Sequence, residues 1–221
     1  MAEHEYAISF WAHQFAQHFT FIAAFLKRYD IEKFEEYGEE LKHFETAWMQ
    51  VQHNPNSLTD ALMNDTLRIK KAIKKQVKHL PCIPALITHM LEELNYFDES
   101  ILQHKYTLQD EIEYWSKEHA ENLEFVGCEL PRLIQEDGKG SIPNFLKQML
   151  EEGAQLANEF KQQNNFEEFM LLKQKHLESI NKLLHKLPHI PLNKQTMQDV
   201  KEMLQHEKHE AMFASLYMEL K

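Results

Sequence analysis

The chain repeats short motifs at a spacing of just over one hundred residues, and this repetition limits the folds open to it. Trp11 returns as Trp115, an offset of 104 (115 − 11 = 104). The string Leu80-Pro-Cys-Ile-Pro84 returns as Leu187-Pro-His-Ile-Pro191, an offset of 107 (187 − 80 = 107). A unit of about one hundred residues can bury a core of its own, so the repeat predicts two similar halves.

Each half contains four stretches in which apolar residues recur three and four positions apart, the spacing of an amphipathic helix. Only 5 glycines and 7 prolines interrupt the 221 residues, which is typical of a helical protein. The sequence therefore predicts an all-α fold of two tandem four-helix bundles, over 1–106 and 107–221. We expect helices over 5–28, 31–52, 58–79, 84–104, 108–136, 142–163, 166–186 and 196–220.

The charge of the chain excludes two classes of partner. A formal net charge of −11 repels nucleic acid and anionic membranes, so we expect neither to bind. The one basic run, Lys70–Lys78, is interleaved with Ile69, Ile73 and Val77 at helical spacing, which predicts the solvent-facing side of an ordinary helix. No apolar run approaches the roughly 20 residues that a membrane span requires.

The beginning of the sequence and its cysteines predict a soluble, cytoplasmic protein. The first residues lack the cationic start and apolar stretch of a signal peptide. The only cysteines, Cys82 and Cys128, lie far apart and outside any CxxC pattern, which is typical of a reducing compartment. Metal binding through sulfur is therefore not expected.

Two His/Glu pairs carry the chemistry of the sequence. His89 and Glu93 lie four residues apart on the apolar stripe of one predicted helix, and His206 and Glu210 do so on its counterpart. Burying an ionised carboxylate is costly unless a partner compensates its charge. Each pair therefore either satisfies other buried polar groups or holds a metal ion.

In the first half, His18 lies on the inward stripe of the first predicted helix. If that helix neighbours the fourth, His18, His89 and Glu93 converge in the bundle core. Two imidazoles and one carboxylate suit Fe, Mn or Zn and leave positions for water or a small ligand. The other ring nitrogen of a ligating histidine needs an acceptor, for which Gln14, Gln17 or a helix-end carbonyl would serve.

In the second half, the offset of 104 places Asn122 where His18 was (122 − 18 = 104), with Glu118, His119 and Glu121 close by. We take Glu121 as the carboxylate ligand, with His119 as its competitor. The predicted set is Glu121, His206 and Glu210. A set richer in carboxylate is harder, which favours Mn or Fe over Zn.

The motifs together resemble a known bacterial family. They are Phe10-Trp11, Gln17-His18 with Phe21-Ile22 after it, and Leu-Pro-x-Ile-Pro before His89-x-x-x-Glu93, and each has a counterpart in the second half. This pattern, which spans essentially the whole chain, resembles the family catalogued as domain of unknown function 2935. The resemblance implies tandem ferritin-like four-helix bundles that bind metal, and it supplies no reaction.

The resemblance also bears on the number of ions. In that family each first helix tends to carry an adjacent acidic-His pair. This pair falls on Gln17-His18 and on Glu121-Asn122, so each copy keeps one member and has lost the other. The departures favour three-ligand sites with a single ion over a dinuclear centre.

Three functions remain open. The leading hypothesis is a cytoplasmic metal-binding bundle with a mononuclear Fe or Mn site, or Zn in their place, and a redox or O₂-related role. Whether it is an enzyme stays undecided. The alternative is a metal-free interaction or scaffold protein, which the lost partners Gln17 and Asn122 favour. A hemerythrin-like oxygen binder ranks third, because the chain has HxxxE but does not have the further histidines of the hemerythrin pattern at inward positions. Assembly as a homo-oligomer stays open.

Overall fold

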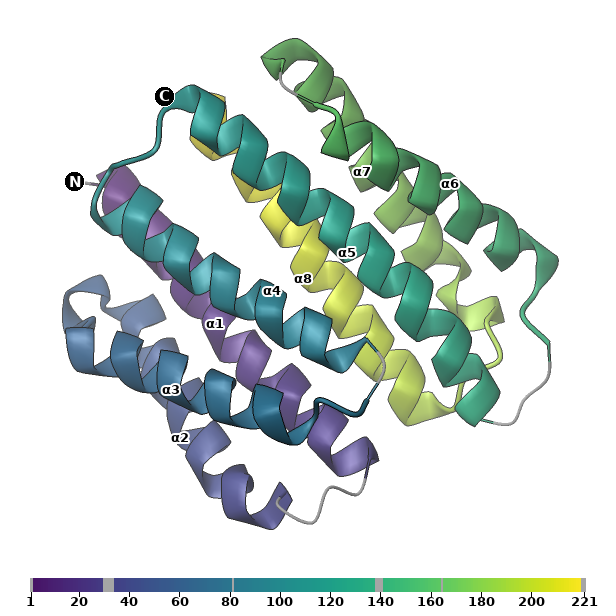
Figure 1. Cartoon of the computed structure of the whole chain (residues 1–221), viewed down its shortest axis with the longest axis horizontal. Helices are drawn as coiled ribbons and strands as arrows, with labels where there is room; N and C mark the ends of the chain where they lie inside the picture. The colour runs from purple at the N-terminus through teal and green to yellow at the C-terminus, as the bar shows by residue number, and fades with distance from the viewer. Residues whose placement is uncertain (1, 30–33, 81, 138–140, 164, 220–221) are drawn as a thin grey trace. The chain divides into compact units, whose positions relative to one another are not determined.

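The fold of the chain is helical, as the periodicity predicts. The structure, a computed structural model, describes residues 2–29, 34–80, 82–137, 141–163 and 165–219. These residues form eight α-helices and no strand (Figure 1). The chain divides into two compact units, unit 1 over Met1–Lys105 and unit 2 over Tyr106–Lys221. The finer prediction of tandem ferritin-like bundles stays a prediction.

Unit 1 contains the first four helices. Their bounds are α1 Ala2–Arg28, α2 Phe34–His53, α3 Asp60–Gln76 and α4 Ile83–Tyr96. The Thr59 side chain caps α3 by accepting from the Leu62 amide at 3.2 Å. Pro84 lies in the first turn of α4, where a missing N–H costs nothing. A π-helical segment, Phe97–Leu102, extends α4, so the predicted fourth helix, 84–104, covers two conformations.

Aromatic side chains fill the core of unit 1. Trp11, Phe15, Trp48 and Phe97 are buried, and Phe15 contacts the other three with ring centroids 4.8–5.6 Å apart. The Trp48 indole N–H donates to Thr66 Oγ1 at 2.9 Å, so its polar atom is satisfied. This core holds α1, α2 and the π-helical segment around the side chains discussed below.

Unit 2 repeats the four-helix order. Its helices are α5 Leu108–Glu136, α6 Asn144–Lys161, α7 Phe166–Lys186 and α8 Lys194–Glu219. Thr107 and Asp110 form a capping box at the start of α5. At the other end of α5, the Asp137 carboxylate accepts two hydrogen bonds from Asn193. The backbone N–H donates at 2.6 Å and the side-chain Nδ2 at 2.7 Å. These bonds tie the end of α5 to the start of α8.

The core of unit 2 contains imidazoles where unit 1 has apolar side chains. His119 occupies the repeat position of Phe15 (119 − 15 = 104), and His176 that of Ile69 (176 − 69 = 107). Both histidines are fully buried, and their ring centroids lie 4.9 Å apart. Phe160 lies against both rings at 5.3 and 6.0 Å. The repeat therefore conserves the helices but not the polarity of the core.

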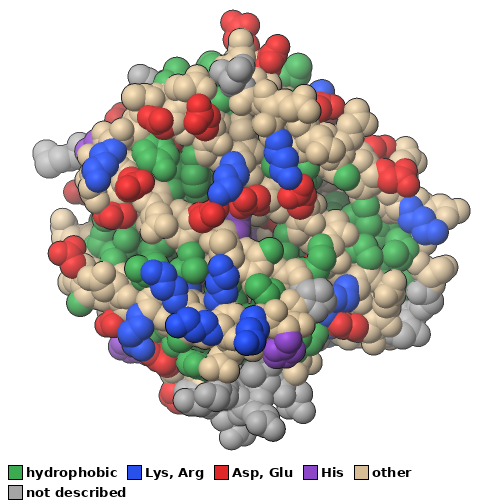
Figure 2. Space-filling model, viewed as in Figure 1, with side chains coloured by type: hydrophobic (Ala, Val, Ile, Leu, Met, Phe, Trp, Pro, Cys, Tyr) green, Lys and Arg blue, Asp and Glu red, His purple; other side chains and the backbone are tan. Residues whose placement is uncertain are grey.

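The basic run Lys70–Lys78 is only partly a solvated face. Figure 2 shows Lys and Arg side chains gathered over α3, and Lys71, Lys75 and Lys78 are exposed. Lys70 is fully buried, so the prediction that the run faces solvent is wrong for this residue. The stripe Thr66, Lys70, Ile73 turns inward at helical spacing, and Lys70 lies on it.

Two sequence features were used to predict the location of the protein, the absence of a membrane span and the state of the cysteines. Among the described residues, no helix combines the length and the apolar character needed to cross a bilayer. Neither Cys82 nor Cys128 is a free thiol, so the cysteines give no support to a reducing compartment. The cytoplasmic location stays a prediction.

Candidate metal centres

In unit 1, Glu93 lies between two imidazoles. Its Oε2 is 3.1 Å from His18 Nε2, and its Oε1 is 3.6 Å from His89 Nε2. The Glu93 side chain is fully buried, and both histidines are buried as well. Helix α1 presents His18, and α4 presents His89 and Glu93 one turn apart. The structure thus brings together the three residues that the sequence predicts for this half.

A fourth ionisable side chain, that of Lys70, lies beside these three residues. The sequence prediction missed it. Lys70 Nζ lies 3.0 Å from His18 Nδ1 and donates to the Met90 carbonyl at 3.0 Å. Burial lowers the pKa of Lys70 to about 7, and the Glu93 carboxylate opposes part of that shift. An ammonium group only donates, so it directs the proton of a neutral His18 to Nε2, which faces Glu93.

The spacing of these donor atoms fits a transition-metal ion. Nitrogen and oxygen ligands lie about 2.0–2.2 Å from Zn²⁺ and similar ions, so neighbouring ligand atoms stand about 3.0–3.5 Å apart. The first distance at Glu93, 3.1 Å, lies in this range, and the second, 3.6 Å, lies just above it. The chain therefore carries buried His/Glu clusters that could hold a metal ion.

In unit 2, the same kind of cluster forms around Glu210. His206 Nε2 lies 3.1 Å from Glu210 Oε1 on α8. From α5, Asn122 Nδ2 donates to Glu210 Oε2 and to Glu118 Oε1, each at 3.4 Å. Glu118 and Asn122 are 3% and 4% exposed, and Glu210 is fully buried. The amide thus lies between two buried carboxylates.

The structure places Glu121 apart from these residues. Its side chain is 31% exposed, and its Oε1 lies 3.6 Å from Lys117 Nζ at the helix surface. Glu118, one turn before Asn122, supplies the buried carboxylate instead. A signal in the sequence pointed to it, because offset 104 places Glu118 on Gln14 (118 − 14 = 104), one turn before His18 on the inward stripe of α1.

The competitor, His119, has another role. It lies among aromatic rings, stacked on Phe169 with centroids 6.0 Å apart and tilted against His176 at 4.9 Å. Burial lowers the pKa of His176 to about 4, because the interior disfavours the imidazolium. Both residues therefore belong to the buried core of unit 2, and His176 is a neutral ring there at neutral pH.

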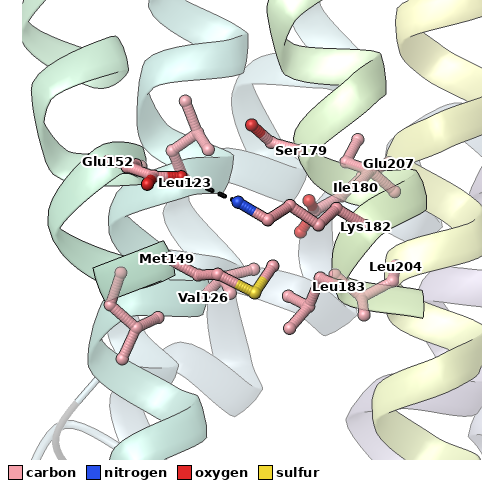
Figure 3. Close-up of a pocket in the computed structure, with 12 residues that line it drawn as sticks. Leu123, Val126, Met149, Glu152, Ser179, Ile180, Lys182, Leu183, Leu204 and Glu207 are labelled. Atoms are coloured by element: carbon pink, nitrogen blue, oxygen red, sulfur yellow. Dashed lines mark hydrogen bonds and ion pairs between the residues drawn. The ribbon is translucent and has the colours of Figure 1, made fainter. Parts of the chain in front are cut away.

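A cavity of about 40 Å³ lies among the four helices of unit 2, with room for about one or two water molecules. Its lining is largely apolar, and Figure 3 shows Lys182 reaching toward Glu152, with Nζ 3.2 Å from Oε2. None of the predicted ligands lines this cavity. It is therefore separate from the His/Glu cluster of the unit.

No protein-family model, curated protein or solved structure matches the chain. The similarity to the domain of unknown function 2935 family accordingly stays a prediction. The chemistry of the side chains is what supports a function.

Proposed function

We propose that this protein binds Fe or Mn ions, with Zn as a substitute, through one buried His/Glu cluster in each unit. In unit 1 the ligands are His18, His89 and Glu93. In unit 2 they are Glu118, His206 and Glu210, with Glu118 taking the place of Glu121. We retain the ferritin-like bundle as the proposed fold relationship.

The observation that carries the proposal is the position of Glu93. A carboxylate that is fully out of solvent has its two oxygens within 3.1 and 3.6 Å of two imidazole nitrogens. Burying such a charge is unfavourable without strong compensation. A divalent ion supplies that compensation and uses all three groups as ligands at once.

The residues also limit the chemistry. Two neutral imidazoles and one carboxylate hold a divalent ion while leaving coordination positions for an exogenous ligand. When bound, Fe or Mn supplies redox chemistry, which is the basis for proposing an O₂-related role. The burial of all three side chains excludes bulk water, and the Lys70 contact orients His18.

The test is elemental analysis of the full chain, purified without an affinity tag. We expect close to one equivalent of Fe or Mn per working cluster, reduced in His89→Ala, and a melting temperature that falls by several degrees in EDTA because the ion binds only the folded state. His79→Ala, on the segment after α3, is the control. Less than about a tenth of an equivalent of any transition metal, unchanged by His89→Ala, would overturn the proposal.

A second function, a metal-free interaction protein, has one specific observation in its favour. The ammonium of Lys70 is a buried cation whose charge acts on Glu93, so the charges of unit 1 can balance without an ion. This hypothesis expects the His/Glu contacts to persist as they are and the melting temperature to be the same with and without EDTA. The metal analysis above decides between the two.

A further inference from the structure

Gln14 is a buried amide that the His/Glu chemistry does not use. It lies on α1, four residues before His18, so both side chains leave the same face of the helix one turn apart. Gln14 is fully buried. Among the described residues, neither its Nε2 nor its Oε1 has a hydrogen-bond partner. A side chain with two donors and an acceptor is thus enclosed without protein partners.

Such an amide is unfavourable as packing alone. Burying a primary amide without hydrogen bonds raises the free energy of the folded state, whereas burying a leucine or methionine of similar size does not. Buried polar groups without protein partners in native proteins call for a specific explanation, such as a bound ligand. The position next to His18 indicates where that ligand binds.

The same position in unit 2 shows a different arrangement. Glu118 replaces Gln14 and Asn122 replaces His18 at the offset of 104. There the amide is Asn122, whose Nδ2 donates to Glu118 and Glu210 at 3.4 Å. The unit 2 amide therefore has carboxylate acceptors within its own unit, whereas the unit 1 amide has none.

Charge selects the kind of ligand. A divalent ion held by two neutral imidazoles and one carboxylate keeps a net charge of about +1, while two carboxylates and one imidazole reduce it to about zero. The buried ammonium of Lys70 adds positive charge beside His18. Unit 1 is therefore the unit that favours an anion.

We propose that Gln14 is a positioning residue that donates a hydrogen bond from Nε2 to a small monoanion coordinated to the ion of unit 1. This inference rests on the proposed metal-binding function and adds the class of exogenous ligand. The anion is small because Gln14 and the three proposed ligands are all buried, and its acceptor atom satisfies the buried amide.

The experiment uses the full chain loaded with Co²⁺, with azide as the probe and visible absorption as the readout. Azide affinity is expressed per bound Co²⁺. We expect Gln14→Leu to weaken azide binding about tenfold, the effect of losing a hydrogen bond to a charged acceptor. Gln14→Glu, which copies the unit 2 residue, should weaken it further. Gln50→Leu, the same substitution at an exposed position of α2, is the matched control and should change it by less than about twofold.

A second readout separates ligand binding from a structural role. In the metal-free protein, Gln14→Leu should raise the melting temperature, because an apolar side chain replaces an amide without partners. A lower melting temperature, or azide affinity within about twofold of the parent, would overturn the proposal while Co²⁺ still binds. If the parent chain binds no Co²⁺, the metal-binding function itself fails, and the role of Gln14 is overturned with it.

Discussion

Units 1 and 2 use the same four repeat positions with different chemistry. The four are Gln14, His18, His89 and Glu93 in unit 1, and Glu118, Asn122, His206 and Glu210 in unit 2. Each set contains three side chains that could ligate a metal and one amide, but the amide and the proposed ligand exchange places on the first helix. The difference teaches that ligand number was kept while charge was not.

The cores around these positions differ in the same direction. Unit 1 surrounds its cluster with aromatic rings and one buried ammonium, Lys70. Unit 2 has two buried imidazoles, His119 and His176, in the corresponding layer. We therefore expect unit 1 to respond to anions and unit 2 to acid.

The largest effect should come from removing the central carboxylate of one unit. We expect Glu93→Gln to weaken metal binding in unit 1 by about a thousandfold, more than the 10–100-fold typical of groups outside the ligand set. Glu210→Gln should do the same in unit 2. Isothermal titration with Mn²⁺ and Zn²⁺ measures the metal affinity that each variant retains. The unit 2 cluster left in Glu93→Gln should prefer Mn²⁺ over Zn²⁺ more strongly than the unit 1 cluster left in Glu210→Gln. If either single substitution abolishes all binding, the two units do not hold independent ions, and the comparison breaks.

The next effect concerns acid stability. The pKa of His176 is lowered by burial to about 4 from 6.5, so the unfolded chain binds a proton that the folded chain refuses. Stability that is fully present above pH 6.5 is therefore lost as the pH falls toward 4, by about 2–3 kcal/mol at pH 4.5. We expect His176→Phe to remove most of this pH dependence in urea unfolding at pH 7.5 and 4.5. His185→Phe, at an exposed position on the same helix, is the control, and an unchanged slope in His176→Phe would contradict the assignment.

A smaller effect separates Glu118 from Glu121. In the Glu93→Gln background, which reports on unit 2, we expect Glu118→Gln to weaken Mn²⁺ binding by about a hundredfold or more, because the loss of a proposed ligand should exceed the effect of groups outside the ligand set. Glu121→Gln weakens a surface pair with Lys117, so its effect should stay below about twofold. The reverse order would restore Glu121 as the ligand.

The smallest effect tests the buried ammonium of unit 1. In the Glu210→Gln background, Lys70→Met should strengthen Mn²⁺ binding about tenfold, because it removes a positive charge that acts on Glu93. Lys71→Met, its exposed neighbour on α3, should leave the affinity the same. Weaker binding in Lys70→Met would show that the ammonium supports the ligand geometry more than it opposes the ion.

The helices could be predicted well from the sequence, because their apolar stripes are long and regular. Seven predicted helices begin and end within about four residues of the observed ones, and the fourth ends in a π-helical segment that periodicity does not distinguish. The inward positions of His18, His89, Glu93, His206 and Glu210 also follow from their stripes, and the structure buries all five.

Two features of the clusters escaped prediction for physical reasons. Glu121 was chosen over Glu118 because both carboxylates lie close to Asn122 in the sequence, although the repeat offset from Gln14 points to Glu118. Lys70 was hidden in a run of lysines, in which composition suggests solvent for every member. Only the three-four spacing with Thr66 and Ile73 separates Lys70 from its exposed neighbours.

The ammonium that Lys70 places inside unit 1 has a consequence for the order of events during biosynthesis. Many small metalloproteins stay unfolded until an ion arrives, because metal binding supplies the free energy of their folding. Here the polypeptide brings a countercharge of its own, so maturation need not wait for the supply of metal. If the proposed metal binding holds, loading is a late and exchangeable step, in which the incoming cation replaces the charge that a lysine supplies in the metal-free protein.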